Sequence, residues 1–197
     1  MPVTAIDPRT ALIVIDLQKG ILAMASPNVF APLVEKTRLL LQAFRSHHLP
    51  VVLVNVDGKP SGRTEQNRGP TSFPAGWTEL IPELNQQPSD HLVTKRTAGA
   101  FTNTDLEKYL KEKEVTQVVI VGVATSMGVE STARHAHELG FNVTLATDAM
   151  ADLVPECHTN SISRVFPRMA ETGTTEEIIA LIESSIKQKA GETHAIS

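Results

Sequence analysis

The stretch Gln117–Met150, QVVIVGVATSMGVESTARHAHELGFNVTLATDAM, decides the fold of this chain. It opens on a continuous apolar run, Gln117–Gly122, and ends in a second β-branched run, Asn142–Ala146. The segment between them, Val129–Leu139, has helical spacing. Apolar runs without polar alternation indicate strands buried on both faces, as in a parallel sheet between two helix layers. The stretch therefore predicts a strand–helix–strand unit with parallel strands.

The same alternation continues on either side of this unit. Further strands are predicted at Ala11–Asp16, Pro50–Asn55 and His91–Lys95, with a very short sixth strand just before Thr174. Helices are predicted over 32–47 and 105–114, and capping-box spacing occurs at Thr104 with Glu107 and at Thr174 with Glu177. We expect an α/β, doubly wound, six-stranded and mostly parallel sheet with helices on both faces. The polar end, about 188–197, is expected to be a flexible tail.

Length and composition limit the domain count and the partners. With 197 residues, of which 41% are hydrophobic, we expect one domain spanning 1–197. A net charge of −4 argues against a nucleic-acid or anionic-membrane surface, so a small-molecule substrate is expected. The apolar run Val118–Ala124 is too short to cross a bilayer, and the first residues carry no export signal.

The single cysteine, Cys157, cannot form an internal disulfide, and no cysteine cluster could hold zinc. A reducing, cytoplasmic location is therefore expected. A lone cysteine is most often an inert, buried packing residue, and this is the favoured interpretation of Cys157.

One long polar segment, Asp57–Gly76, fits neither a strand nor a helix. Loops of this length inside a compact domain are usually either functional or disordered, and the sequence leaves both open.

Ligands of open parallel sheets bind beyond the carboxyl ends of the strands, where Asp16 and Lys95 stand. Taken alone, Asp16 could be a turn residue, and Lys95 could be a solvated lysine. A carboxylate at the end of a buried strand is costly unless it is paired, solvated or protonated, and Lys95 can pair with it.

The turn after Gln117–Gly122 leads directly into a helix. Its backbone N–H groups at Met127, Gly128 and Val129 could face an anion or a developing oxyanion. The turn contains neither of the glycine-rich phosphate-binding patterns.

Three separated segments, ALIVIDLQKG (11–20), TKRTAGAF (94–101) and the second-half stretch from Val119 to Met150, resemble the signature stretches of the isochorismatase-like (cysteine hydrolase) superfamily in order and spacing. The resemblance runs from about Arg9 to Thr175. It implies a six-stranded parallel sheet and a homo-oligomer, a dimer or larger. It also implies a non-proline cis peptide near Val123–Ala124.

By this resemblance the family's catalytic aspartate, lysine and cysteine fall on Asp16, Lys95 and Gly128, so the thiol is missing. Without a thiolate, the covalent amidase mechanism of the family is not expected. No cofactor is implied, and the family's occasional metal site is not expected because the histidine spacing is absent. The substrate-binding residues are expected to be Gln18, Phe101, Val123, Ala124 and Met127.

Two functions remain open at this point. The first is a hydrolase like the isochorismatases proper, in which Asp16 acts as a general acid on a vinyl ether and Lys95 holds a substrate carboxylate, with Arg63 or Arg68 as a further contact. The second is a catalytically silent protein that binds a small molecule or a protein partner on the same scaffold.

Overall fold

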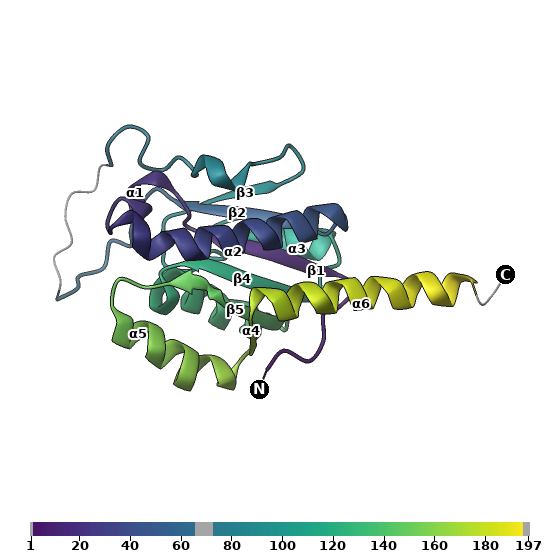
Figure 1. Cartoon of the computed structure of the whole chain (residues 1–197). Helices are drawn as coiled ribbons and strands as arrows, with labels where there is room; N and C mark the ends of the chain where they lie inside the picture. The colour runs from purple at the N-terminus through teal and green to yellow at the C-terminus, as the bar shows by residue number, and fades with distance from the viewer. Residues whose placement is uncertain (1, 66–72, 195–197) are drawn as a thin grey trace.

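The computed structural model describes residues 2–65 and 73–194. Its strands form a single sheet in the order β3-β2-β1-β4-β5-β6, and every neighbouring pair is parallel (Figure 1). The strands are β1 (Thr10–Ile15), β2 (Val51–Val56), β3 (His91–Lys95), β4 (Gln117–Val123), β5 (Asn142–Ala151) and β6 (Glu171–Gly173). The predicted fold class is confirmed, and the sheet is wholly rather than mostly parallel.

Helices cover both faces of this sheet. They are α1 (Lys19–Leu22), α2 (Pro27–Ser46), α3 (Leu106–Glu112), α4 (Glu130–Glu138), α5 (Pro155–Asn160) and α6 (Thr175–His194). Shorter helical turns are η1 (Pro82–Leu84), η2 (Thr125–Val129), η3 (Ser161–Val165) and η4 (Phe166–Arg168). Helices α2 and α6 lie on one face of the sheet, and α3 and α4 pack on the other.

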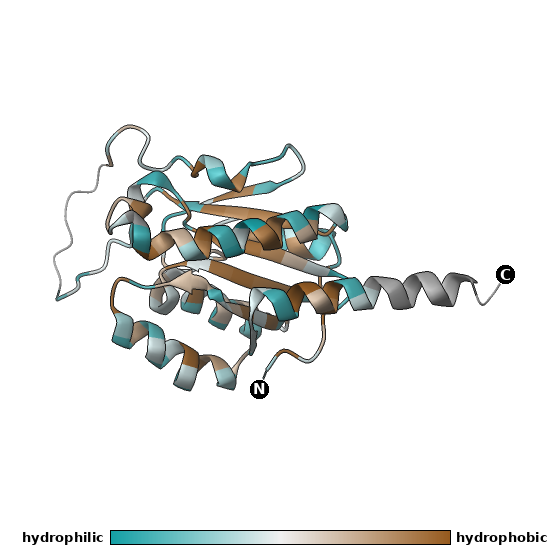
Figure 2. Ribbon diagram, in the orientation of Figure 1, coloured by the Kyte–Doolittle hydropathy of each residue, from teal (hydrophilic) through white to brown (hydrophobic). Residues whose placement is uncertain are grey.

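The continuous apolar strands are explained by two cores, one on each side of the sheet. In β1, Leu12 and Val14 face the core under α2 and α6, whereas Ile13 and Ile15 face the core under α3 and α4. Successive side chains of a strand point to opposite faces, so a strand between two helix layers needs apolar residues at every position. Figure 2 shows the resulting hydrophobic sheet inside a more polar helix layer.

The strand order reverses between β1 and β4, which places the candidate ligand crevice at their carboxyl ends. Gly122 permits these two strands to approach here. Its φ is +120°, and a Cβ at this position would lie 2.1 Å from the Ile15 carbonyl oxygen. Directly beyond this contact lie Asp16, after β1, and the turn η2, after β4.

Helix α6 extends into the segment for which a flexible tail was expected, and the flexibility of this segment stays a prediction. Where a flexible tail was expected from 188, α6 continues to His194, and 195–197 lie outside the described residues. Helix α6 begins in a formed capping box, in which Thr174 N–H donates to Glu177 and Glu177 N–H donates to the Thr174 hydroxyl. Once nucleated and packed through Ile178 and Ile182, a helix propagates at little cost per residue.

No helix in 2–65 or 73–194 combines the length and the apolar character needed to cross a membrane.

Candidate functional site

Asp16 follows the last residue of β1 and turns the chain there. Its φ is +54°, in the left-handed region that aspartate tolerates better than most non-glycine residues. Its N–H donates to the Val54 carbonyl at 2.9 Å, and its own carbonyl accepts the Gln18 N–H at 2.9 Å. The backbone on both sides of Asp16 is therefore fixed by hydrogen bonds.

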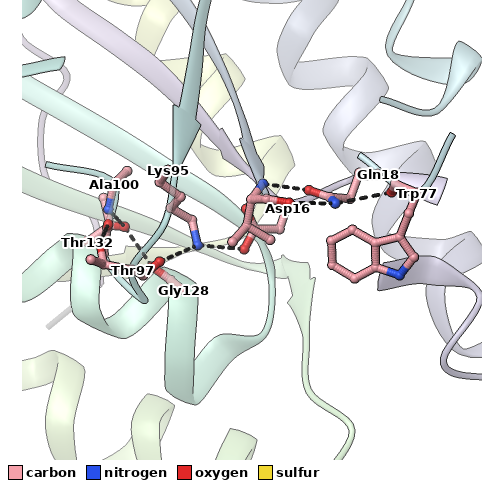
Figure 3. Close-up of polar contacts among 10 residues, drawn as sticks. Asp16, Gln18, Trp77, Lys95, Thr97, Ala100, Gly128 and Thr132 are labelled. Atoms are coloured by element: carbon pink, nitrogen blue, oxygen red, sulfur yellow. Dashed lines mark hydrogen bonds and ion pairs between the residues drawn. The ribbon is translucent and has the colours of Figure 1, made fainter. Parts of the chain in front are cut away.

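Lys95, the last residue of β3, reaches Asp16 across the end of β2. Its Nζ lies 2.8 Å from Asp16 Oδ2 and donates a second hydrogen bond, of 3.1 Å, to the Thr97 carbonyl (Figure 3). Asp16 is 5% exposed and Lys95 only 2%. The pair suggested by the strand ends is thus present, and it is almost completely buried.

Burial raises the pKa of the Asp16 carboxyl to about 6, although the positive charge of Lys95 and its hydrogen bond act in the opposite direction. The other carboxyl oxygen, Oδ1, is buried and has no hydrogen-bond partner among the described residues. Asp16 therefore combines an oxygen held by Lys95 with a second oxygen able to carry a proton near neutral pH.

Gly128 lies against this carboxyl. A Cβ at Gly128 would lie 3.3 Å from Asp16 Oδ2, 3.1 Å from the Val123 carbonyl oxygen and 2.8 Å from Ile15 Cγ2. A side chain at this position would therefore point at the Asp16–Lys95 pair. The structure brings together the three residues that the sequence singled out.

The backbone N–H groups of η2 are less available than expected. The N–H groups of both Met127 and Val129 donate to the Ala124 carbonyl, at 3.1 and 3.2 Å. The Ser126 N–H and hydroxyl both donate to Asp152 Oδ2. The expectation that the Met127 and Val129 N–H groups face an anion is therefore wrong, because the π-helical turn uses them internally.

Gln18 is fully buried, and its amide is occupied by backbone groups. Its Nε2 donates to the carbonyls of Val56 and Trp77 at 3.1 and 3.2 Å, and its Oε1 accepts the Val56 N–H at 2.7 Å. Gln18 thereby ties the end of β2 and the segment around Trp77 to Asp16, as Figure 3 shows. A direct contact between Gln18 and a substrate stays a prediction.

The other expected substrate-binding residues lie in different surroundings. Phe101 is 5% exposed and packs in the α3 and α4 core, near the rings of His135 and Phe141. Val123 ends β4 in the opposite core, whereas the Met127 side chain is half exposed. The peptide bond between Val123 and Ala124 is cis, as the resemblance implied.

Sequence reasoning missed two residues at the site. Trp77 packs its indole against Gly20, where a Cβ would lie 2.1 Å from the ring. Thr132 is fully buried and hydrogen-bonds both Gly128 and Ala100. The one available signal was that Thr132 stands four residues after Gly128, which directly precedes the helix predicted over Val129–Leu139. Residues i and i+4 share a face once the helix extends over both.

Among the residues that the structure describes, no group of three or more His, Cys, Asp or Glu side chains could hold a metal ion. Cys157 is exposed rather than buried, so the packing interpretation of this residue is wrong. Arg63 is exposed, and Arg68 lies outside the described residues, as do the other residues of 66–72.

The chain is similar in sequence to proteins of one known family. Residues 10–177 match the family described as the Isochorismatase domain. The chain is 38% identical to the isochorismatase family protein YwoC of Bacillus subtilis, over 89% of this chain and 95% of YwoC. It is 39% identical to the isochorismatase family protein YecD of Escherichia coli O157:H7, over 86% and 94% of the two chains.

A solved structure agrees with the fold. An isochorismatase family protein from Burkholderia thailandensis superposes with a TM-score of 0.86 and 35% identity. The match covers 91% of this chain and 98% of that protein.

Proposed function

We propose that this chain, which belongs to the isochorismatase family of hydrolases, acts on a small carboxylate-bearing metabolite without a cysteine nucleophile. The observation that carries the proposal is the buried Asp16–Lys95 pair with Oδ1 of Asp16 unpartnered among the described residues. Relatives of this chain include amidases as well as isochorismatases, so the missing thiol bears directly on the reaction.

Gly128 is proposed to occupy the position of the nucleophile. The direction of its missing side chain, toward Asp16 Oδ2, supports this assignment. Carboxamide hydrolysis through a covalent acyl intermediate needs a nucleophilic side chain, which glycine does not have. A reaction that begins with proton transfer needs only an acid.

Hydrolysis of a vinyl ether is such a reaction. Asp16 donates its proton to the terminal carbon of the double bond, forming a C–H bond and an oxocarbenium ion. Water adds to this ion, the resulting hemiketal releases an alcohol, and the remaining fragment leaves as pyruvate. The proton released from water returns to Asp16.

Lys95 is proposed to hold the substrate carboxylate. An ammonium has three N–H donors, and Asp16 and Thr97 accept two of them. A substrate carboxylate at the third would bring a negative charge close to Asp16 and raise the pKa of that carboxyl further. Substrate binding itself would therefore favour the protonated acid.

The proposal also covers the residues around the Asp16–Lys95 pair, the location of the protein and its oligomeric state. Gln18, Phe101, Val123, Ala124 and Met127 are proposed to shape the pocket, with Gln18 and Phe101 acting from buried positions. We place the chain in the cytoplasm as a single-domain homo-oligomer, which its one cysteine and the family membership support.

The test is incubation of the purified protein with isochorismate and with a set of carboxamides, measuring the release of pyruvate and ammonia. We expect pyruvate release by the wild type and a loss of about 10²-fold or more in Asp16→Asn, because general acids typically contribute this much. Isochorismate should still bind Asp16→Asn in calorimetry. Asp57→Asn is the matched control, since Asp57 follows β2 and pairs with Arg96.

Full activity of Asp16→Asn would rule out the general-acid role. Ammonia release by the wild type would instead show that the protein hydrolyses carboxamides. In that case a side chain elsewhere in the site would have to serve as the nucleophile that Gly128 does not supply. Binding without any turnover would favour the second candidate, a catalytically silent binding protein, which is supported by the glycine, Gly128, at the proposed position of the nucleophile.

A further inference from the structure

The loop from Arg96 to Ala100, between β3 and α3, is fastened to α4 by one buried hydroxyl. Thr132 of α4 is fully buried, and its Oγ1 accepts the Ala100 N–H at 3.1 Å. The same hydroxyl donates to the Gly128 carbonyl at 2.7 Å. One side chain thus joins the loop to the turn that faces Asp16, as Figure 3 shows.

This loop supplies one of the acceptors that orient the Lys95 ammonium. Lys95 Nζ donates to the Thr97 carbonyl at 3.1 Å while it contacts Asp16 Oδ2 at 2.8 Å. Inside the loop, the Thr97 hydroxyl donates to the Gly99 carbonyl at 2.8 Å. A Cβ at Gly99 would lie 3.3 Å from the Ser131 carbonyl oxygen, so the loop packs closely on α4.

We propose that Thr132 is a positioning residue of the site, which holds the 96–100 loop on α4 so that the Thr97 carbonyl keeps the Lys95 ammonium on Asp16. The proposal rests on the proposed roles of Asp16 and Lys95 for its meaning in catalysis. Thr132 itself touches neither of these side chains through any of its hydrogen bonds.

The hydroxyl is what this role requires. A hydroxyl can accept one hydrogen bond and donate another, whereas a valine of nearly the same shape can do neither. Thr132→Val leaves the Ala100 N–H without its acceptor and releases the loop from α4. Thr132→Ser keeps both hydrogen bonds.

The experiment is titration of the Asp16 carboxyl in the full chain by ¹³C NMR, with the signal identified by its loss in Asp16→Asn. Lys95 is the charged group that pairs with Asp16 within the described part of the chain, and its charge lowers the Asp16 pKa. Loosening Lys95 in Thr132→Val should raise that pKa by about 0.5 or more. Thr132→Ser should titrate like the wild type.

Thr144→Val is the matched control. Thr144 is also fully buried, and its hydroxyl accepts a hydrogen bond from Gln117, near the amino ends of β4 and β5. Its loss should leave the Asp16 titration unchanged. If the Asp16 pKa rises equally in Thr132→Val and Thr144→Val, the rise is a response to the loss of any buried hydrogen bond. That result would overturn the proposal.

Gly99→Ala keeps the test open if Thr132→Val does not fold, because it pushes the loop from α4 while Thr132 stays in place. An unchanged Asp16 titration in folded Thr132→Val would overturn the role of Thr132. If Thr132→Val is unfolded, an unchanged titration in Gly99→Ala would overturn it, because the position of the 96–100 loop on α4 would then have no effect on Asp16. The titration needs no substrate, so it tests the role of Thr132 even if the protein hydrolyses nothing. An absence of hydrolysis would count against the proposed function alone.

Discussion

At the level of single residues, the site depends on a carboxyl group kept out of water. Asp16 and Lys95 are almost fully buried, and their attraction offsets only part of the cost of removing both charges from solvent. Protonation of Asp16 removes its negative charge and therefore avoids the free-energy cost of burying that charge. The raised pKa of this carboxyl reflects this effect.

The pH dependence of hydrolysis follows from this pKa. If Asp16 acts as a general acid, the active form is protonated, and kcat/KM should fall about tenfold per pH unit above a pH of about 6. The measurement is the initial rate of pyruvate release from pH 5 to pH 8. A rate that rises with pH across this window would mean that Asp16 acts as a base.

Gly128 is packed so closely against Ile15 that it leaves little room for a side chain. Gly128→Ala should destabilise the protein by about 1–3 kcal/mol, because the added methyl carbon would lie 2.8 Å from Ile15 Cγ2. Urea unfolding measures this change. In an Ile15→Ala background the same substitution should cost less, since the clashing methyl is gone. Equal costs in both backgrounds would show that Ile15 does not set the limit.

At the level of elements, similar sequence signals gave different local structures. Thr174 and Glu177 form a reciprocal capping box at α6. At α3 the N-cap is Asp105, and Glu107 forms an ion pair with Lys111 instead of reaching back to Thr104. The predicted box at α3 is therefore wrong, because the Thr104 hydroxyl accepts the Leu106 N–H rather than the Glu107 N–H.

The two glutamates provide a matched pair for a stability measurement. Glu177→Ala should lower the free energy of unfolding by about 1 kcal/mol, through loss of the hydrogen bonds that it accepts from Thr174. Glu107→Ala removes an exposed ion pair and should change stability by about 0.5 kcal/mol or less. Equal effects in thermal unfolding would show that the α6 box contributes nothing of its own.

At the level of the whole molecule, Asp16 links folding to pH in the direction opposite to most paired carboxylates. Its pKa in the folded chain, about 6, lies above the ordinary value of 3.8. The folded chain therefore binds this proton more tightly than the unfolded chain does. The stability that Asp16 contributes is present below a pH of about 4 and is lost as the pH rises to about 6.

The measurement is urea unfolding of the wild type and Asp16→Asn from pH 4 to pH 7. The difference in unfolding free energy, wild type minus variant, should fall by at most about 3 kcal/mol over this range. Asp57 is the control with the opposite sign, because Arg96 lowers the pKa of its carboxyl. The corresponding difference for Asp57→Asn should rise with pH mainly below pH 4 and stay nearly level from pH 4 to pH 7. A rise for Asp16→Asn between pH 4 and pH 7 would contradict the burial argument.

The sequence by itself determined the sheet and its parallel strands, and it placed Asp16 and Lys95 at strand ends, whereas the family resemblance grouped them with Gly128. Continuous apolar runs have one stable environment, between two helix layers, and parallel strands bring their carboxyl ends to one edge. Residues at those ends therefore share one edge of the sheet, and the strand order decides which of them touch. Family resemblance added the cis peptide between Val123 and Ala124.

Only the tertiary structure decided which partner each polar group takes. Gln18 is saturated by backbone groups 38 and 59 positions away, and η2 uses the N–H groups of Met127 and Val129 on Ala124. Thr132 joins a loop 32 positions earlier to the turn. Such pairings depend on side-chain direction and close packing between distant segments, which periodicity along one chain does not encode.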